Sequence, residues 1–220
     1  MSFLPGHFPA AVLEDAEVAP LTTLTQVASN TSIASTITGP AGIVAGDLLV
    51  YFDNARGSSG APTTVTPSGF SLVATNTIGN DRQNISIKIA TGAEANAAIA
   101  GMNGTDSNQK LMYVFRGDVP ILAANASTPN GEATNGNPSD QNVLSSAGVV
   151  PLVVIAGYGS ESGIDPRTFT PTKDGEINVT SNNDAWLAYK IYNSSPADVN
   201  VDMTDEGNGN IIQSFYVACS

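Results

Sequence analysis

The chain has little of what disulfide-stabilised and nucleic-acid-binding proteins need. Its 220 residues include one cysteine and only 13% charged residues, with 8 basic against 20 acidic side chains and a net charge of −12. Cys219 has no partner for an internal disulfide, which excludes a disulfide-stapled scaffold. The acidic balance repels phosphate backbones and anionic lipid surfaces, so we expect neither nucleic acid nor a membrane as a partner.

Long apolar runs and catalytic sets are missing as well. The longest apolar stretch, residues 149–156, contains Pro151 and is too short to span a bilayer. Residues 1–20 have no basic segment followed by a continuous apolar run, so we expect no secretory signal there. His7 is the sole histidine, which disfavours a Ser-His-Asp relay and a zinc site. The sequence therefore predicts a protein that is not an enzyme and has no cofactor.

What the chain does contain is turn formers and short alternating strands. There are 21 Gly and 13 Pro, with many Thr, Ser and Asn between apolar runs. Ile85, Ile87 and Ile89 alternate with polar residues, the period of a half-buried strand. Short alternating strands separated by turns predict an all-β fold. The expected form is an antiparallel β-sandwich of about eight strands with a jelly-roll-like topology.

The second half of the chain resembles the first. Residues 47–52 (DLLVYF) match residues 151–156 (PLVVIA), with Leu48 on Leu152. A Gly/Ser-rich loop is expected after each run, at residues 54–60 and 157–163, followed by a Thr-Pro pair at the same distance. Beyond that pair, and after a two-residue deletion, further residues align: Ile85, Ile87 and Ile89 with Leu187, Tyr189 and Ile191, and 113–115 with 215–217. Two degenerate four-stranded repeats are therefore predicted to build one sandwich.

The domain prediction follows from this repeat. Residues 44–220 are predicted to form the sandwich, with repeat halves 44–120 and 149–220 joined by a polar linker. Residues 1–43 precede the repeat as an extended N-terminal arm and a lead-in strand, with a short helix possible over 10–16. The arm has scattered apolar residues that fit a segment ordering on a partner subunit, and these are the predicted partner-binding residues: Phe3, Leu4, Phe8 and Val12. The other interpretation is an N-terminus without fixed structure.

Two groups of polar side chains could carry chemistry. Paired carboxylates could support glycoside hydrolysis, although most lie at expected turns or strand ends: Asp47, Asp53, Asp165, Glu176 and Asp202. The loop 202–210 offers oxygen ligands for Ca²⁺ but lacks EF-hand spacing.

Aromatic residues and the cysteine have structural interpretations. Trp186, Tyr189 and Tyr192 could stack on a sugar, but alternation puts Trp186 and Tyr189 on opposite faces of one strand and favours a core role for Trp186. Cys219 is expected to be a small buried hydrophobic residue. No catalytic, cofactor-binding or metal-binding residue is therefore predicted.

Four segments of the first half resemble a recurrent pattern of tailed-bacteriophage virion proteins. They are a G-D-L-L strand, a P-x-G-[WF] turn, a K-x-A-x-x-x-E segment and a Y-x-x-R-G strand, at residues 46–51, 66–70, 88–94 and 113–117. Phe70 stands where Trp is commoner, and a degenerate second copy follows over 152–218. The resemblance covers about three quarters of the chain and its motifs are structural.

The resemblance implies a β-sandwich on the outer surface of the virion, with no activity of its own. We expect a capsid decoration or cement protein, or a related minor head or tail component. Its partners would be major capsid or tail subunits and further copies of itself. We expect these copies to form a symmetric homo-oligomer, as most oligomeric proteins do. The alternative is a receptor- or glycan-binding tail or fibre module. That role needs exposed aromatics near the loops at 54–60 or 157–163, where Tyr158 is the only one.

Overall fold

The computed structural model describes residues 20–128, 130–134, 141–143, 151–160, 172–180, 184–194, 199–201 and 210–220. These residues form β-strands and no helix, and every strand pairing among them is antiparallel. The predicted all-β, antiparallel class is confirmed. Within the described ranges, then, no helix is long and apolar enough to cross a membrane.

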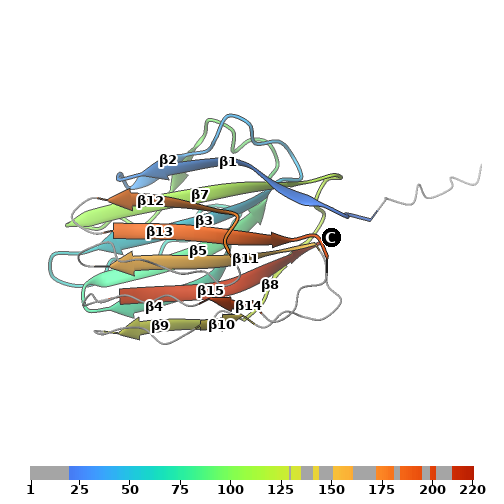
Figure 1. Ribbon diagram of the computed structural model, residues 1–220. Helices are drawn as coiled ribbons and strands as arrows, with labels where there is room; N and C mark the ends of the chain where they lie inside the picture. Colours follow the sequence, from blue (N-terminus) through green and yellow to red (C-terminus); the bar gives the residue numbers. More distant parts are fainter. Residues whose placement is uncertain are drawn as a thin grey trace, which may run out of the picture.

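Two large sheets make up most of the molecule (Figure 1). The first has five strands in the order β1 (Leu24–Ser32), β7 (Ser107–Gly117), β3 (Leu48–Arg56), β5 (Asp81–Ile89) and β4 (Ser71–Ile78). The second has six: β12 (Gly175–Thr180), β13 (Asp184–Tyr192), β11 (Leu152–Ser160), β15 (Asn210–Cys219) and β8 (Ala124–Ala126), with β9 (Asn130–Thr134) also paired to β15. Each sheet is thus built from one half of the chain.

The two sheets have the same strand order. The first reads β1-β7-β3-β5-β4, and the second, from its other edge, reads β8/β9-β15-β11-β13-β12. Each half also has one short two-stranded sheet, β2 (Thr36–Thr38) with β6 (Ala98–Ala100) and β10 (Gln141–Val143) with β14 (Val199–Val201). The strand series of each half therefore begins before the repeat boundaries that the sequence suggests, at β1 and at β8.

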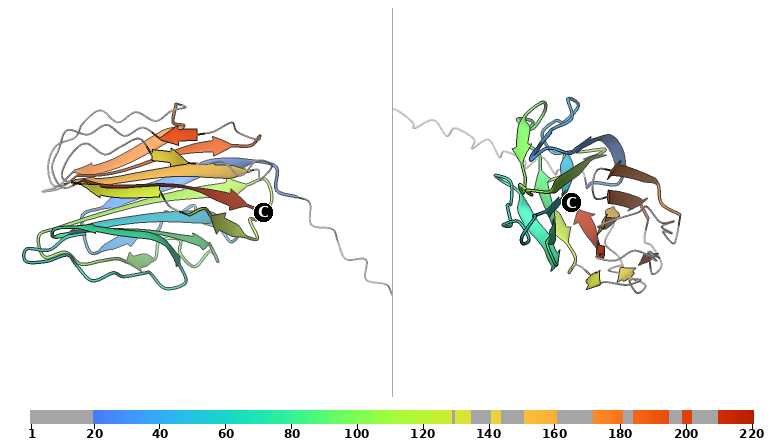
Figure 2. Two further views of the ribbon diagram at one scale, coloured as in Figure 1. Left: turned by 90° about the horizontal axis from the view of Figure 1, so that it is seen from below. Right: turned by 90° about the vertical axis from the view of Figure 1, so that its left-hand side faces the viewer.

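The main core lies between the two sheets, which stack face to face (Figure 2). It is one cluster of buried side chains drawn from both sheets, including Leu48, Val50 and Phe52 of β3 and Val153 and Ile155 of β11. Burying this continuous apolar layer is the main stabilising contribution to the fold.

Both sheets also have buried outer faces. On the first sheet, Tyr51 and Met112 pack against Ile37 and Ile99 from the two short strands β2 and β6. On the second sheet, Trp186 lies in an outer cluster with Leu152, Val154, Ala156 and Ala188. Central strands that are covered on both faces lose polar alternation, which explains the unbroken apolar runs in β3 and β11.

Two details of the repeat prediction are wrong. The expected loops at 54–60 and 157–163 begin later, because β3 continues to Arg56 and β11 to Ser160. The alignment of the first strands is also shifted by one residue. Leu48 pairs with Ile89 and Phe115, whereas Val153 pairs with Ile191 and Val217.

The sequence alignment of the two halves places residue 89 on residue 191 and residue 115 on residue 217. Val153 is therefore the counterpart of Leu48. Burial agrees, since Leu48 and Val153 face the main core while Leu152 belongs to the outer cluster. A strand covered on both faces has no polar residue to fix which face points inward, so the apolar run alone could not set this register.

The entry to β1 is held firmly by both sheets. Leu21 is buried in the main core, and the Asp118 carboxylate accepts hydrogen bonds from the backbone N–H groups of Thr22 and Thr23 at 3.1 and 3.2 Å. The Asn193 amide, just beyond β13, accepts from the Leu24 N–H at 2.7 Å and donates to its carbonyl at 3.3 Å. The predicted anchors Phe3, Leu4, Phe8 and Val12 and the possible helix at 10–16 lie outside the described residues.

Candidate functional site

The first and fourth of the motif segments, residues 46–51 and 113–117, meet in one ion pair. Asp47, just before β3, is 1% exposed and receives two hydrogen bonds from Arg116 on β7, at 2.7 Å to Oδ1 and 2.8 Å to Oδ2. Arg116 also donates to the Gly42 carbonyl at 2.7 Å, and the Val44 N–H donates to Asp47 at 2.9 Å. Because the Arg fork fits a carboxylate in two places, this pair fixes both position and orientation. It ties the start of β3 to the end of β7.

The other two motif segments meet at a second ion pair, which lies within residues 88–94 and contacts Phe70 of residues 66–70. Lys88 on β5 contacts the Glu94 carboxylate at 2.6 Å, and its ammonium lies 5.6 Å from the centre of the Phe70 ring. Glu94 also accepts hydrogen bonds from the N–H groups of Thr91 and Gly92, both at 3.0 Å. Burial alone would raise the pKa of Glu94, but the hydrogen bonds from Lys88, its own N–H and Thr91 outweigh it and lower the pKa to about 2.

Gly69 explains the glycine in the P-x-G-F turn. The Phe70 N–H donates to the Pro67 carbonyl at 3.0 Å, and Gly69 has a φ of +77°, as the third position of a type II turn requires. A Cβ at Gly69 would lie 2.8 Å from the Lys88 ammonium. The turn therefore needs glycine for its backbone and for the approach of Lys88.

A hollow of about 250 Å³ opens beside this second pair. Its walls include Pro67, Phe70, Lys88, Glu94 and Ile99. The volume is below the range of about 300–1,000 Å³ that small-molecule pockets usually have. The cation in its wall is already neutralised by Glu94, which leaves no free charge to attract an ionic ligand.

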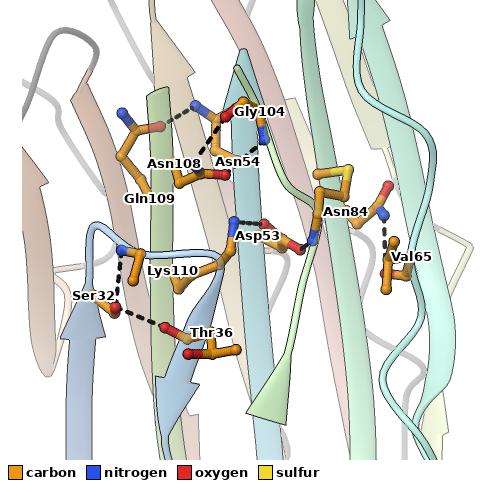
Figure 3. Close-up of polar contacts among 12 residues, drawn as sticks. Ser32, Thr36, Asp53, Asn54, Val65, Asn84, Gly104, Asn108, Gln109 and Lys110 are labelled. Atoms are coloured by element: carbon orange, nitrogen blue, oxygen red, sulfur yellow. Dashed lines mark hydrogen bonds and ion pairs between the residues drawn. The ribbon is translucent and has the colours of Figure 1, made fainter. Parts of the chain in front are cut away.

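The most unusual chemistry of the first sheet is a buried pair between adjacent strands (Figure 3). Asp53 on β3 and Lys110 on β7 are opposite each other in register, and the Lys110 ammonium contacts Asp53 Oδ1 directly. Their exposed fractions are 1% and 0%. The other carboxylate oxygen, Oδ2, accepts the Met102 N–H at 2.6 Å. Burial raises the pKa of Asp53, against the opposing effect of Lys110, and lowers the pKa of Lys110, against that of Asp53.

Glycine and tyrosine complete the surroundings of this pair. A Cβ placed on Gly101 would run into the Tyr51 hydroxyl, and it would lie 2.6 Å from Asp53 Oδ2 and 2.7 Å from Lys110 Cε. The three side chains therefore converge beneath Gly101. The buried Tyr51 hydroxyl makes no hydrogen bond in the part of the chain that the structure describes.

Buried amides link the two sheets at the same end of the sandwich. Asn54 donates to Gln109 within the first sheet at 2.9 Å, and Gln83 donates across to the Ile211 carbonyl of the second sheet at 3.0 Å. Gln213 of the second sheet lies within 3.5 Å of the Gln83 carbonyl. These contacts fix the stacking of the sheets at a place where apolar packing gives little orientation.

The carboxylates considered for glycoside hydrolysis do not form a pair among the described residues. Asp47 immediately precedes β3 and Asp53 lies six positions further along it, which is about 20 Å in extended chain, while such pairs need about 5 to 9.5 Å. Glu176 lies in the other sheet, 2.7 Å from Lys173 and 2.5 Å from the Trp186 indole nitrogen. Asp165, Asp202 and the 202–210 loop considered for Ca²⁺ lie outside the described residues.

The aromatic and cysteine predictions are confirmed where the structure describes them. Trp186 is 2% exposed in the outer cluster of the second sheet, and Tyr189 lies on the opposite face in the main core. Tyr192 is half-buried against the Trp186 cluster. Cys219 is buried in the main core. His7 lies outside the described residues, as does the second half of the loop region after Ser160.

Sequence reasoning missed Lys110 and Tyr51. Both lie on strand faces that also carry apolar residues, so neither looked like a site. A usable signal was the alternation Lys110, Met112, Val114, which puts a lysine on a face of otherwise apolar residues.

Comparison with known proteins gives no relative: no family model, no curated protein and no solved structure matches this chain. In the described ranges, moreover, no three His, Cys, Asp or Glu side chains gather as a metal site.

Proposed function

We propose that this chain is a non-enzymatic structural component of a bacteriophage virion, a capsid decoration or cement protein that binds other virion subunits on the outer surface. One observation carries the proposal. The four motif segments of the resemblance meet around two ion pairs: Asp47 of the first segment pairs with Arg116 of the fourth, while Lys88 pairs with Glu94 within the third and lies over the Phe70 ring of the second. The motifs thus act as a structural frame, which is the role that they have in the resemblance.

The ion pairs of the carboxylates that were considered for glycoside hydrolysis agree with a structural role. Asp47, Asp53 and Glu176 each contact a cation, so each carboxylate stabilises packing where it lies. An acid that serves as a proton donor needs a raised pKa and access to a substrate. Burial raises the pKa of Asp53, but the same burial closes its carboxyl group off from solvent and from any substrate.

Two edge strands of the first sheet favour contact with other subunits. Among the strands that the structure describes, β1 and β4 each pair on one side only, and neither contains a charged residue. Val27 and Leu72, on these strands, are exposed large apolar residues at 40% and 41%. Each strand also has a register shift, between Gln26 and Ala28 and between Leu72 and Ala74, that bends the edge and limits pairing to one part of it. Strand addition and apolar burial are the proposed modes of association, with a homo-oligomer as the expected form.

The arm is proposed to attach the sandwich to the shell. Deleting residues 1–19 leaves Leu21 and the contacts at Thr22, Thr23 and Leu24 in place, so the truncated chain is expected to fold with unchanged unfolding temperature. It is expected to lose binding to undecorated particles in a sedimentation assay. Retained binding would contradict the role of Phe3, Leu4, Phe8 and Val12.

Copy number and position on purified particles test the proposal as a whole. Quantitative mass spectrometry with electron cryomicroscopy is expected to find hundreds of copies over the capsid. A few copies at the tail would favour the alternative, a receptor- or glycan-binding module. Absence from every particle would overturn the virion assignment.

The finer parts of the fold prediction stay proposals. Four neighbouring strands in each sheet, β7-β3-β5-β4 and β15-β11-β13-β12, agree with eight strands from two four-stranded repeats. The jelly-roll-like connectivity has less support, because consecutive strands such as β4 and β5 pair within one sheet.

A further inference from the structure

The Asp53–Lys110 pair has the arrangement of two reactants held in contact. The amine and the carboxyl group lie on adjacent central strands, opposite each other in register, and the Lys110 ammonium touches Asp53 Oδ1. Both residues are closed off from solvent, at 0% and 1% exposure. Such intramolecular positioning is worth effective concentrations of about 10⁵–10⁸ M for a bond-forming step.

We propose that Asp53 and Lys110 condense after folding into a side-chain amide bond that joins β3 to β7. This modification is independent of the virion assignment and rests on the geometry of the pair.

The step balances without any co-reactant. A proton passes from the ammonium to the carboxylate, which gives a neutral amine and a carboxylic acid. The Nζ lone pair attacks Cγ, the new C–N bond forms, and the bond from Cγ to Oδ1 breaks. Oδ1 leaves with the carboxyl proton and one proton from Nζ as a single water molecule, and nothing is oxidised or reduced.

The surroundings favour each part of this step. Burial favours the neutral forms, since it raises the pKa of Asp53 and lowers that of Lys110. The Met102 N–H, 2.6 Å from Oδ2, is placed to stabilise the negative charge that develops there when Nζ adds to Cγ. Gly101 closes the site over Tyr51, Asp53 and Lys110, and a site closed to solvent disfavours the return of water for hydrolysis.

The other ion pairs of the chain provide the contrast. Lys88 and Lys190 contact Glu94 and Asp174, but the lysine side chains are 16% and 25% exposed. Water reaches both lysine side chains, so these pairs are expected to remain ion pairs. They serve as internal controls.

Intact-mass spectrometry of the full chain under denaturing conditions tests the proposal. The expected mass is one water molecule below that of the sequence, and Lys110→Met is expected to restore the sequence mass. Lys190→Met is the matched control and is expected to keep the loss. Asp53→Asn is expected to lose ammonia instead of water, since the amide nitrogen is then the leaving group.

Trypsin digestion locates the bond and separates it from dehydration elsewhere in the chain. Trypsin cleaves after Arg56 and after Lys88, so Asp53 falls in peptide 1–56 and Lys110 ends peptide 89–110. An acylated Lys110 is not cleaved, and the expected product is 1–56 joined to 89–116. The proposal would be overturned if folded protein, after incubation for days, still had the full sequence mass and was cleaved normally after Lys110.

Discussion

Phe52 on β3 packs directly over Gly157 on β11, its counterpart in the other half of the chain. A Cβ at Gly157 would lie 2.6 Å from Cδ2 of the Phe52 ring and collide with its edge. The same kind of contact recurs two residues further along each strand. A Cβ at Gly159 would lie 2.7 Å from Cγ of Asn54. The corrected register makes 52 equivalent to 157 and 54 equivalent to 159. The two central strands therefore fit together because large residues in one half face glycines in the other.

Replacing Gly157 with alanine is expected to destabilise the sandwich. The added methyl group overlaps a fully buried ring, and overpacking of this kind costs about 1–3 kcal/mol. Gly42→Ala is the control, because a Cβ there meets no atom within 4 Å and is expected to change stability little. Urea unfolding measures both.

The double variant Phe52→Leu with Gly157→Ala isolates the contact. The smaller side chain is expected to recover part of the loss caused by Gly157→Ala, which gives a favourable coupling energy in the double-mutant cycle. Additive losses would mean that the two residues do not pack on each other.

Alternation made most of the strands predictable from the sequence. Ile85, Ile87 and Ile89 alternate with two polar residues, and their alignment with Leu187, Tyr189 and Ile191 agrees with the strand register. The apolar runs of β3 and β11 gave no such information, and Leu48 was aligned one residue away from Val153. Fold class thus follows from local pattern, while the register of a doubly covered strand depends on which neighbours fill its two faces.

The buried pair could not be predicted for a related reason. Asp53 was expected at a strand end, where solvated acids are common, because Asn54 and the glycines after it suggested a loop. β3 instead continues past it through pairing with β5 and β7. Only the three-dimensional structure brings Lys110, more than fifty residues later, to the same point.

Breaking the Asp47–Arg116 pair is expected to destabilise the first sheet. Asp47→Asn leaves a buried side chain that can no longer accept two charge-assisted hydrogen bonds, with an expected loss of about 2–3 kcal/mol. Arg116→Lys keeps the charge but removes the fork, and a smaller loss is expected.

The matched control is Lys190→Gln, which removes an ion pair to Asp174 at the surface. The expected change is within about 1 kcal/mol, as for other exposed pairs. Guanidinium unfolding of the three variants gives the comparison. Equal effects of Asp47→Asn and Lys190→Gln would contradict the structural role of the Asp47–Arg116 pair.

The single cysteine gives a direct measure of core integrity. Burial raises the pKa of Cys219 to about 12. Since the thiolate is the reactive form, native protein at pH 8 is expected to react with a thiol reagent at least about a thousandfold more slowly than unfolded protein. A colorimetric disulfide reagent with and without denaturant measures this ratio. Rapid reaction of one thiol per chain in the native state would show that the end of β15 opens easily.

Glu94 is expected to make stability depend on pH. Its pKa is about 2 in the folded protein against an ordinary value of 4.5, so the unfolded chain binds the proton more tightly. The stabilisation by ionised Glu94 is therefore present above pH 4.5 and is lost as the pH falls from about 4.5 to about 2. Glu94→Gln cannot ionise and lacks this contribution at every pH.

The free energy of unfolding, measured by urea titration at several pH values, is expected to differ most between wild type and Glu94→Gln above pH 4.5. The two curves should converge as the pH approaches 2. Asp118 also has a pKa lowered to about 2, by its hydrogen bonds from Thr22 and Thr23, so the variant is expected to keep some of the acid dependence. Curves that stay parallel from pH 6 to pH 2 would mean that Lys88 and the Thr91 and Gly92 N–H groups do not hold Glu94 in its ionised form.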